Sequence, residues 1–230
     1  MLNFIQHNTH KHDVAQHTLL EQASRNQTDV ILVQEPALAR NKMQGLSADA
    51  YICITHPSYD VFTPQPATDL SRIPIAPRVL VYIRKNARIQ ANPRYDICAD
   101  PDLQVIEIVG IPEPFLIVNC YNEQQQRQEG QRQRSERQED RTVNRLLQHI
   151  QLDHRQPALI AGDFNAHHPW WNPACNPSAI SAARPLAEWL TEHQAILIND
   201  PEVTNEKGTY ISAAHSVIDL AFHRGFQTTT

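Results

Sequence analysis

The sequence predicts a single α/β domain with strands in more than one sheet. Its 230 residues, of which 41% are hydrophobic, are enough to bury a core. Short apolar runs rich in β-branched residues alternate with stretches of helical periodicity, which is typical of sheets covered by helices. No apolar run approaches the roughly 18 residues that a membrane-spanning helix needs, and no secretory signal is evident. We therefore expect a soluble, intracellular protein without a membrane partner.

A β–α–β unit opens the chain. Residues 2–8 read as a strand, and the following segment has apolar residues spaced by four, with Asp13 as the expected helix cap. Residues 29–36 form an apolar run closed by a proline, which predicts a buried strand ending in a carboxylate. Because a helix connects these two strands, we expect them to be parallel.

The rest of the chain alternates strands and helices. Further strands are predicted at 51–55, 78–84, 103–109, 115–121, 158–163, 195–198 and 217–222. Proline and polar breaks among the strands between 78 and 121 fit antiparallel connections. One helix is predicted over 135–152 and another over 184–193, where Pro185 is acceptable at the first helical position.

Residues 122–134 are a polar low-complexity segment, rich in Gln and Arg and interleaved with acids. We expect a disordered insertion there. A nucleic-acid-binding role for its arginines stays open, but the interleaved acids favour a solvated surface. Since no linker separates two halves, residues 1–230 are predicted to form one domain.

The formal net charge of −5 argues against binding nucleic acid through bulk electrostatics. It leaves room for an enzyme that meets a phosphodiester through a local basic rim and a metal ion. None of the four cysteines has Cys-x-x-Cys spacing, which argues against a thiolate zinc site or a redox motif. Cys53 and Cys120 lie in apolar runs and are expected in the core.

Acid and amide side chains stand at the ends of three predicted strands: Gln6 with Asn8, Glu35, and Asp163 with Asn165. Strand ends hold such groups on a rigid scaffold while they reach solvent. Oxygen ligands select Mg²⁺ or Mn²⁺, and a carboxamide can bind a phosphoryl oxygen without charge repulsion. Each residue alone is more often a helix cap or a turn residue, so the prediction depends on their order and context.

In that order and context the segments resemble the endonuclease/exonuclease/phosphatase superfamily, particularly the apurinic-like endonuclease domains of non-LTR (LINE-type) retrotransposons. The matching segments span residues 2 to 222: Ile5-Gln6-His7-Asn8, Asp29 to Pro36, Leu116 to Tyr121, Gly162-Asp163-Phe164-Asn165-Ala166-His167 and Ser216 to Phe222. Trp170-Trp171, which follow the fourth segment, point to the retrotransposon branch.

The resemblance implies a four-layered α/β sandwich of two mixed β-sheets flanked by helices, with the site at one edge. It implies divalent-metal-dependent phosphodiester hydrolysis, as a DNA-nicking endonuclease that uses one Mg²⁺ or Mn²⁺. DNA would be the partner, in the nucleus, and a reverse transcriptase domain would belong to the parent polyprotein.

The resemblance also assigns roles to residues. Glu35 would hold the metal, with Asn8 close by. Asp163 would orient and deprotonate the attacking water, and Asn165 would bind the scissile phosphate. Tyr121 would donate a hydrogen bond to a phosphate oxygen.

Three further residues complete the predicted site. Asp219 would orient a catalytic histidine, while Gln6 and His167 would lie on the substrate side. The family's Asn shortly after the catalytic Tyr is not evident, since Tyr121 is followed by Asn122-Glu123-Gln124.

The sequence departs from the family at its last motif, because no Ser-Asp-His occurs in it. We therefore expect Asp219 to lack its histidine and one sheet to lack its last strand. Three histidine groups are open alternatives: His215 as a substitute, the group around His10 as a transition-metal site, and His167-His168 as part of a nucleic-acid cleft. The alternative function is a catalytically impaired, truncated remnant that at most binds metal and nucleic acid.

Overall fold

The structure, a computed structural model, describes residues 2–38, 49–57, 76–122, 142–153, 155–173, 175, 177–199 and 218–226. The helices are α1 (Asp13–Arg25), α2 (Thr142–His149) and α3 (Pro177–Glu192). The strands are β1 (Phe4–Asn8), β2 (Val30–Gln34), β3 (Tyr51–Ile54), β4 (Val79–Arg84), β5 (Gln90–Pro93), β6 (Leu103–Val109), β7 (Phe115–Tyr121), β8 (Ala158–Asp163), β9 (Ile196–Leu197) and β10 (Asp219–Arg224).

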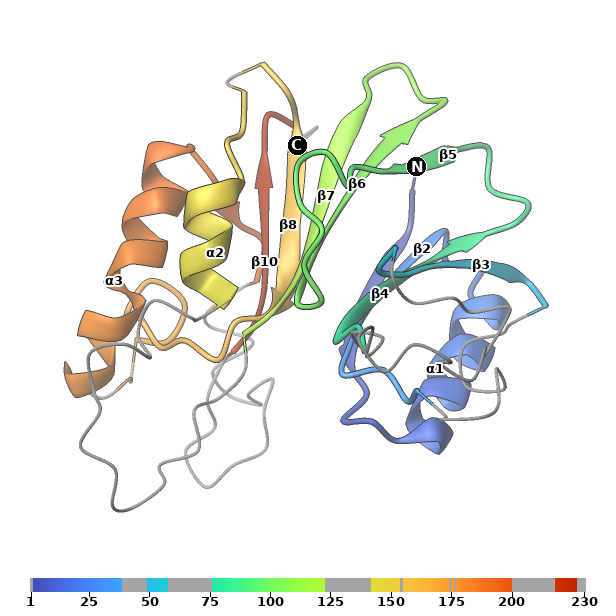
Figure 1. The fold of residues 1–230 in the computed structure, drawn as a ribbon, viewed down its shortest axis with the longest axis horizontal. Coiled ribbons are helices and arrows are strands. Elements are labelled where there is room, and N and C mark those ends of the chain that lie inside the picture. Colours follow the sequence, from blue (N-terminus) through green and yellow to red (C-terminus); the bar gives the residue numbers. More distant parts are fainter. Residues whose placement is uncertain are drawn as a thin grey trace, which may run out of the picture.

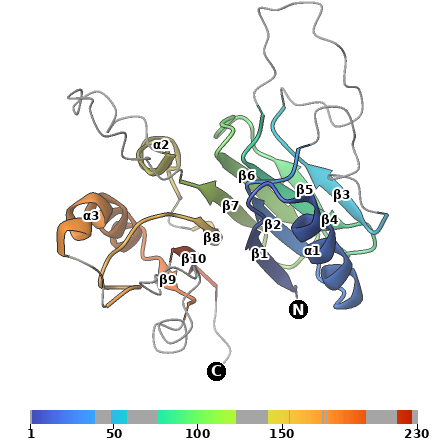
Figure 2. The ribbon, with the colours of Figure 1, turned by 90° about the horizontal axis from the view of Figure 1, so that it is seen from below.

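These elements form four layers, as Figures 1 and 2 show from two sides: α2 with α3, a six-stranded sheet, a four-stranded sheet, and α1. The strand orders are β5-β6-β7-β8-β10-β9 and β1-β2-β4-β3. Both sheets are mixed, because β1 and β2 run parallel, as do β7 and β8, while their other pairs are antiparallel. The predicted fold class and the predicted parallel pair are therefore confirmed.

Each interface between layers has its own apolar cluster. Leu32 and Ile117 belong to the cluster between the two sheets, Leu19 and Ile31 to the cluster under α1, and Leu186 to the cluster under α2 and α3. The central strands are buried on both faces, which explains why they read as continuous apolar runs rather than alternating ones. Cys120 is fully buried as expected and Cys53 partly so, and the four cysteines, all within the described ranges, form no disulfide.

The structure corrects three local predictions. His12 is the N-cap of α1, and Asp13 instead accepts a hydrogen bond from the backbone of Val14 inside the helix (2.8 Å). Helix α3 begins at residue 177 rather than 184, so Pro185 lies in its interior. The apolar face that this helix buries offsets the backbone hydrogen bond that a proline cannot make. The short polar strand β5 was missed because it lacks an apolar pattern.

Helix α2 confirms the second half of the helix predicted over 135–152. The predicted insertion at 122–134 lies outside the described residues apart from Asn122, as does the start of that helix. The prediction of one domain stays a prediction. No helix in the described ranges is both long and apolar enough to cross a membrane.

Candidate active site

Strand direction brings the predicted site residues to one edge of the sandwich. This site edge is defined by the ends of β1, β2, β7 and β8 and the beginnings of β4, β6 and β10. Asn8 pairs in register with Gln34, the residue before Glu35, and Asp163 pairs with both Tyr121 and Asp219. The two sheets therefore present their acid and amide side chains side by side.

Asn8 joins the two central carboxylates. Its Nδ2 donates to Glu35 Oε2 at 3.2 Å and to Asp163 Oδ2 at 2.8 Å, while its Oδ1 accepts from the backbone N–H of His10 at 2.8 Å. Only the amino group of the amide can face two carboxylates without repulsion, so this orientation follows from the charges. Glu35 comes from one sheet and Asp163 from the other, and Asn8 holds them together.

Asp163 is poised to exchange a proton near neutral pH. Its side chain is buried and its Oδ1 accepts from the backbone N–H of Asn165 at 3.1 Å. Burial raises the pKa of Asp163 to about 6, and the charge of Glu35 adds to this; the hydrogen bonds from Asn8 and Asn165 and the charge of His10 oppose it.

Glu35 stays ionised beside it. Burial alone would raise the pKa of Glu35, but hydrogen bonds from Asn8 and Tyr121 and the charges of Lys11 and His10 outweigh burial and lower it. Lys11 Nζ lies 3.5 Å from Glu35 Oε1, and His10 Nδ1 lies 3.4 Å from Oε2. The environment thus gives the two neighbouring carboxyl groups opposite pKa shifts, as acid–base sites require.

Asn122, which the sequence did not predict as a site residue, holds the loop after β8. Asn165 Nδ2 donates to the carbonyl of Asn122 at 2.6 Å, and Asn122 Nδ2 donates to the carbonyl of Phe164 at 2.7 Å. The backbone N–H of Asn122 also donates to the carbonyl of Asp163 at 2.8 Å. The sequence feature that could have indicated this role is the position of Asn122 directly after Tyr121, at the end of a predicted strand.

Gln6 and Asp219 lie together at the same edge, where Gln6 Nε2 donates to Asp219 Oδ1 at 3.4 Å. His167 is directed to Asn172, with 3.4 Å between its Nδ1 and Asn172 Nδ2, and burial lowers its pKa. His168 packs its ring on Trp171. His215 lies outside the described residues. The structure therefore places Gln6 and Asp219 beside the carboxylates and pairs His167 elsewhere.

The donor set fits a hard divalent cation. Mg²⁺ is commonly held by one or two carboxylates, with water and substrate phosphate completing its ligands. The Glu35 side chain is 16% exposed and already attracts two basic side chains, so it can receive a cation. Among the described residues, no group of three or more His, Cys, Asp and Glu side chains is placed to hold a metal ion.

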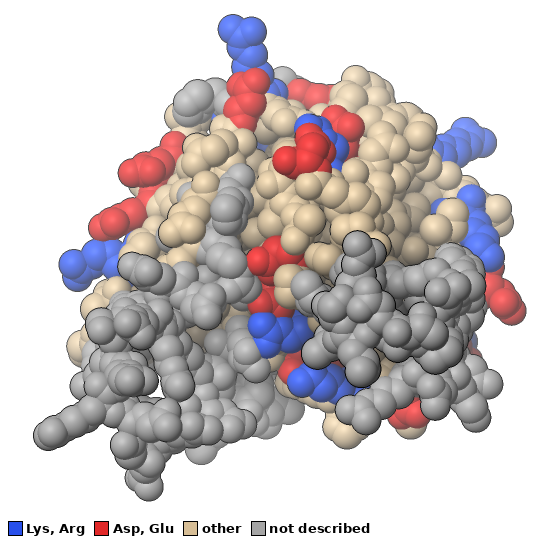
Figure 3. All heavy atoms as spheres, viewed as in Figure 1, with Lys and Arg blue, Asp and Glu red and all other residues tan. Residues whose placement is uncertain are grey.

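The visible face in Figure 3 carries both signs of charge. Acidic and basic side chains meet near its middle, and most of the other described surface there is uncharged.

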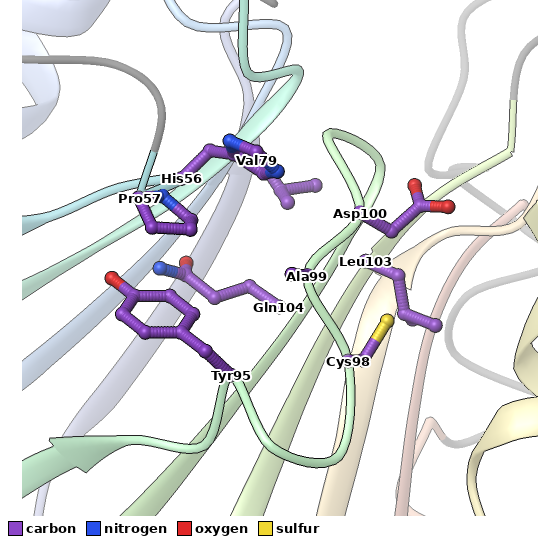
Figure 4. A pocket seen from close by; sticks show the side chains of 9 residues that line it. All are labelled: His56, Pro57, Val79, Tyr95, Cys98, Ala99, Asp100, Leu103 and Gln104. Atoms are coloured by element: carbon purple, nitrogen blue, oxygen red, sulfur yellow. The ribbon is translucent and has the colours of Figure 1, made fainter.

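A small pocket of about 10 Å³ lies between the residues that follow β3, the beginning of β4 and the loop 94–102 that leads into β6 (Figure 4). Gln104 and Tyr95 anchor its walls, since Gln104 donates to the carbonyl of Ile54 at 3.1 Å and Tyr95 to that of Thr55 at 2.8 Å. Asp100, also on the loop, accepts from the backbone N–H of Asp102 at 2.8 Å. The pocket therefore lies where hydrogen bonds hold this loop and the beginning of β6 to the end of β3.

Comparison with known proteins gives a family match over part of the chain and a shared fold. Residues 115–225 match the model of a family described as endonuclease-reverse transcriptase. No curated protein sequence matches the chain.

Solved structures share the fold. The endonuclease domain of TRAS1, a telomere-specific non-LTR retrotransposon, has a TM-score of 0.66 and 14% identity over 98% of this chain and 86% of its own. An AP endonuclease from Archaeoglobus fulgidus has a TM-score of 0.56 and 14% identity over 97% and 86%. TDP2 of D. rerio, complexed with a single-strand DNA product, has a TM-score of 0.53 and 13% identity over 100% and 86%. These structures show that the chain has the fold that the resemblance implies.

Proposed function

We propose that this chain hydrolyses phosphodiesters with a divalent metal and acts as a DNA-nicking endonuclease of the retrotransposon type. The observation that carries this proposal is the Asn8 bridge, which holds an ionised Glu35 beside a buried Asp163 whose pKa is raised. An in-line attack on a phosphodiester needs a cation near the phosphate and a base for water. Glu35 and Asp163 divide these two tasks. The similarity to nucleases of the same fold supports the same activity.

In this mechanism Asp163 accepts the proton of the attacking water, because most of its carboxyl is ionised above its pKa of about 6. Asn165 offers its amide to the scissile phosphate and Tyr121 its hydroxyl to a phosphate oxygen. Asn8 lies between the two carboxylates and donates a hydrogen bond to each, which holds both in one site. Gln6 orients Asp219 beside them.

Glu35 would hold the metal ion, with Asn8 next to it. When bound, Mg²⁺ or Mn²⁺ supplies positive charge that offsets the charge developing on the phosphoryl oxygens. Lys11 and His10, which lie within 3.5 Å of the Glu35 carboxylate, would remain at the rim of this site.

Nicking of supercoiled plasmid with Mg²⁺ tests the proposal. We expect the wild-type protein to nick, Asp163→Ala and an EDTA-treated sample not to nick, and Asp29→Asn at the other end of the sandwich to nick like the wild type. If the wild type and Asp163→Ala nick equally little, the proposed activity is wrong.

A second candidate function is metal-dependent nucleic-acid binding without hydrolysis, as expected of an impaired remnant. It is favoured by the contact between Gln6 and Asp219, because Gln6 donates to the carboxylate that the resemblance assigns to orienting a histidine. The two functions separate in one measurement: Mg²⁺-dependent retention of a DNA duplex without nicking supports binding alone. A reverse transcriptase domain as partner and a nuclear location are further parts of the retrotransposon proposal.

A further inference from the structure

An ion pair beside the site joins the two sheets. Arg78 directly precedes β4 in one sheet, and Asp102 directly precedes β6 in the other. The Nε and Nη2 groups of Arg78 donate to the two carboxylate oxygens of Asp102. The side chain of Asp102 is 1% exposed and that of Arg78 is 30% exposed. This forked geometry fixes the guanidinium in one orientation.

The backbone of the same pair reaches two predicted site residues. The N–H of Glu35 donates to the carbonyl of Arg78 at 2.8 Å, and the N–H of Tyr121 donates to the carbonyl of Asp102 at 2.9 Å. The N–H of Arg78 donates to the carbonyl of Pro101 at 2.7 Å. The ion pair is therefore hydrogen-bonded to both strand ends that supply Glu35 and Tyr121.

The Arg78 side chain also contacts Tyr121 directly. Its guanidinium carbon lies 5.6 Å from the centroid of the Tyr121 ring, within the range of a cation–π contact. The Tyr121 hydroxyl in turn donates to the Glu35 carboxylate. A continuous line of contacts runs from Asp102 through Arg78 and Tyr121 to Glu35.

We propose that Arg78 is a positioning residue that holds the Tyr121 phenol at the carboxylate site, with Asp102 fixing the guanidinium. This inference rests on the proposed function, because the Tyr121 hydroxyl is the group that meets the phosphate. Restraining the ring on one face keeps the hydroxyl aimed at the site between substrates. The cost of a misplaced group is large, since about 1 Å of displacement can slow a reaction ~100-fold.

A matched ion pair at the other end of β4 separates positioning from stability. Arg84 pairs with Asp29, and their side chains are 26% and 6% exposed, close to the burial of the first pair. Asp29 also accepts from the backbone N–H of Asn3 at 3.0 Å, at the edge opposite the site. Both pairs tie an arginine at one end of β4 to a buried aspartate, but of the two arginines Arg78 is the one that contacts a predicted site residue.

The first experiment compares Arg78→Gln with Arg84→Gln by nicking kinetics and thermal melting. We expect similar losses of melting temperature in both variants. Arg78→Gln should lower kcat by ~10- to 100-fold with KM nearly unchanged, while Arg84→Gln leaves both constants alone. Arg78→Lys, which keeps the charge but not the fork, should fall between wild type and Arg78→Gln.

The second experiment places Arg78→Gln in a Tyr121→Phe background. If Arg78 acts through the Tyr121 hydroxyl, the double variant should nick as slowly as Tyr121→Phe alone. The inference would be overturned if the rate losses of the two single variants multiplied in the double variant. It would also be overturned if Arg78→Gln changed KM only, or if Arg78→Gln and Arg84→Gln had equal kinetics.

A third measurement does not need activity. In NMR spectra of the tyrosine-labelled protein, Arg78→Gln should let the Tyr121 ring reorient faster, while Arg84→Gln leaves it unchanged. If the wild type does not nick, the proposed function fails, and an unchanged Tyr121 ring in Arg78→Gln would separately refute the positioning role.

Discussion

The two edges of the sandwich treat a buried aspartate in opposite ways. Asp29, at the opposite edge, and Asp163, at the site edge, are equally buried, each with 4% of its surface exposed. Asp29 is paired with the guanidinium of Arg84, whereas the hydrogen bonds to Asp163 come from the neutral groups of Asn8 and Asn165. At the opposite edge the buried carboxylate of Asp29 is held in an ion pair with an arginine. At the site edge the donors that face Asp163 are neutral, so burial raises its pKa.

Both edges hold residues other than glycine in the left-handed region. At the site edge Glu35 and Asn165 have a φ of 44° each, and the neighbouring His10 and Lys11 have φ of 49° and 59°. At the opposite edge Gln27 has a φ of 53°. What distinguishes the site edge is that two of its strained residues, Glu35 and Asn165, are predicted site residues, as is common at active sites.

The largest expected effect tests whether Asp163 and Asp29 have different roles, one in nicking and the other in stability. Asp163→Asn should slow nicking by ~10²- to 10⁴-fold, since the base for water is lost. Asp29→Asn should leave nicking unchanged and lower the free energy of unfolding instead, because Arg84 loses its partner. Plasmid nicking and urea unfolding measure the two variants; equal nicking by both would remove the distinction between the edges.

The pH dependence sharpens the same comparison. The pKa of Asp163 is raised from 3.8 to about 6, so the folded state binds this proton more tightly than the unfolded state does. The resulting stability is present below pH 3.8 and is lost as pH rises through about 6, a total of about 3 kcal/mol. Wild type should therefore lose unfolding free energy relative to Asp163→Asn between pH 4 and pH 7. Nicking should rise over the same limb, because the base must be ionised.

A glycine at each edge gives the next effect. A Cβ at Gly162, just before Asp163, would lie 1.9 Å from the carbonyl oxygen of Cys120 on β7. We expect Gly162→Ala to lower the free energy of unfolding by about 3 kcal/mol, because the backbones of β7 and β8 must separate. A Cβ at Gly110 meets nothing nearer than 3.4 Å, so Gly110→Ala should cost only about 1 kcal/mol from its φ of +87°. Urea unfolding measures the loss of unfolding free energy in each variant. Equal losses in the two variants would contradict the close approach of the backbones at Gly162.

The smallest effect concerns the Asn8 bridge. Asn8→Ala removes hydrogen bonds that lower the pKa values of Glu35 and Asp163, so the acid limb of nicking should move to higher pH and the rate should fall about tenfold. The same substitution at Asn3, an exposed residue before β1 at the opposite edge, should move neither. If Asn8→Ala does not shift the pH–rate profile, the hydrogen bonds of Asn8 do not set the pKa values of Glu35 and Asp163.

Much of this site could be predicted because its residues follow strands with a strong apolar signal. Asn8, Glu35 and Asp163 each end or directly follow such a strand, and parallel pairing fixes them at a common edge. Arg78 and Asp102 could not be found this way. They lie 24 residues apart in different sheets, and neither stands in a motif. Helix α3 shows the same limit, since the burial of its apolar face outweighs the local preference of Pro185.

The sequence by itself determined most of the strands, the parallel pairing of β1 with β2 and the order of the acid and amide groups, because these depend on local periodicity and on the direction of neighbouring strands. Only the tertiary structure decided the ionisation and partners of those groups. Whether a carboxylate meets an amide, as Asp163 does, or an arginine, as Asp29 does, depends on how two sheets pack face to face. Electrostatic effects depend on distance and burial, and neither can be read from spacing along a chain.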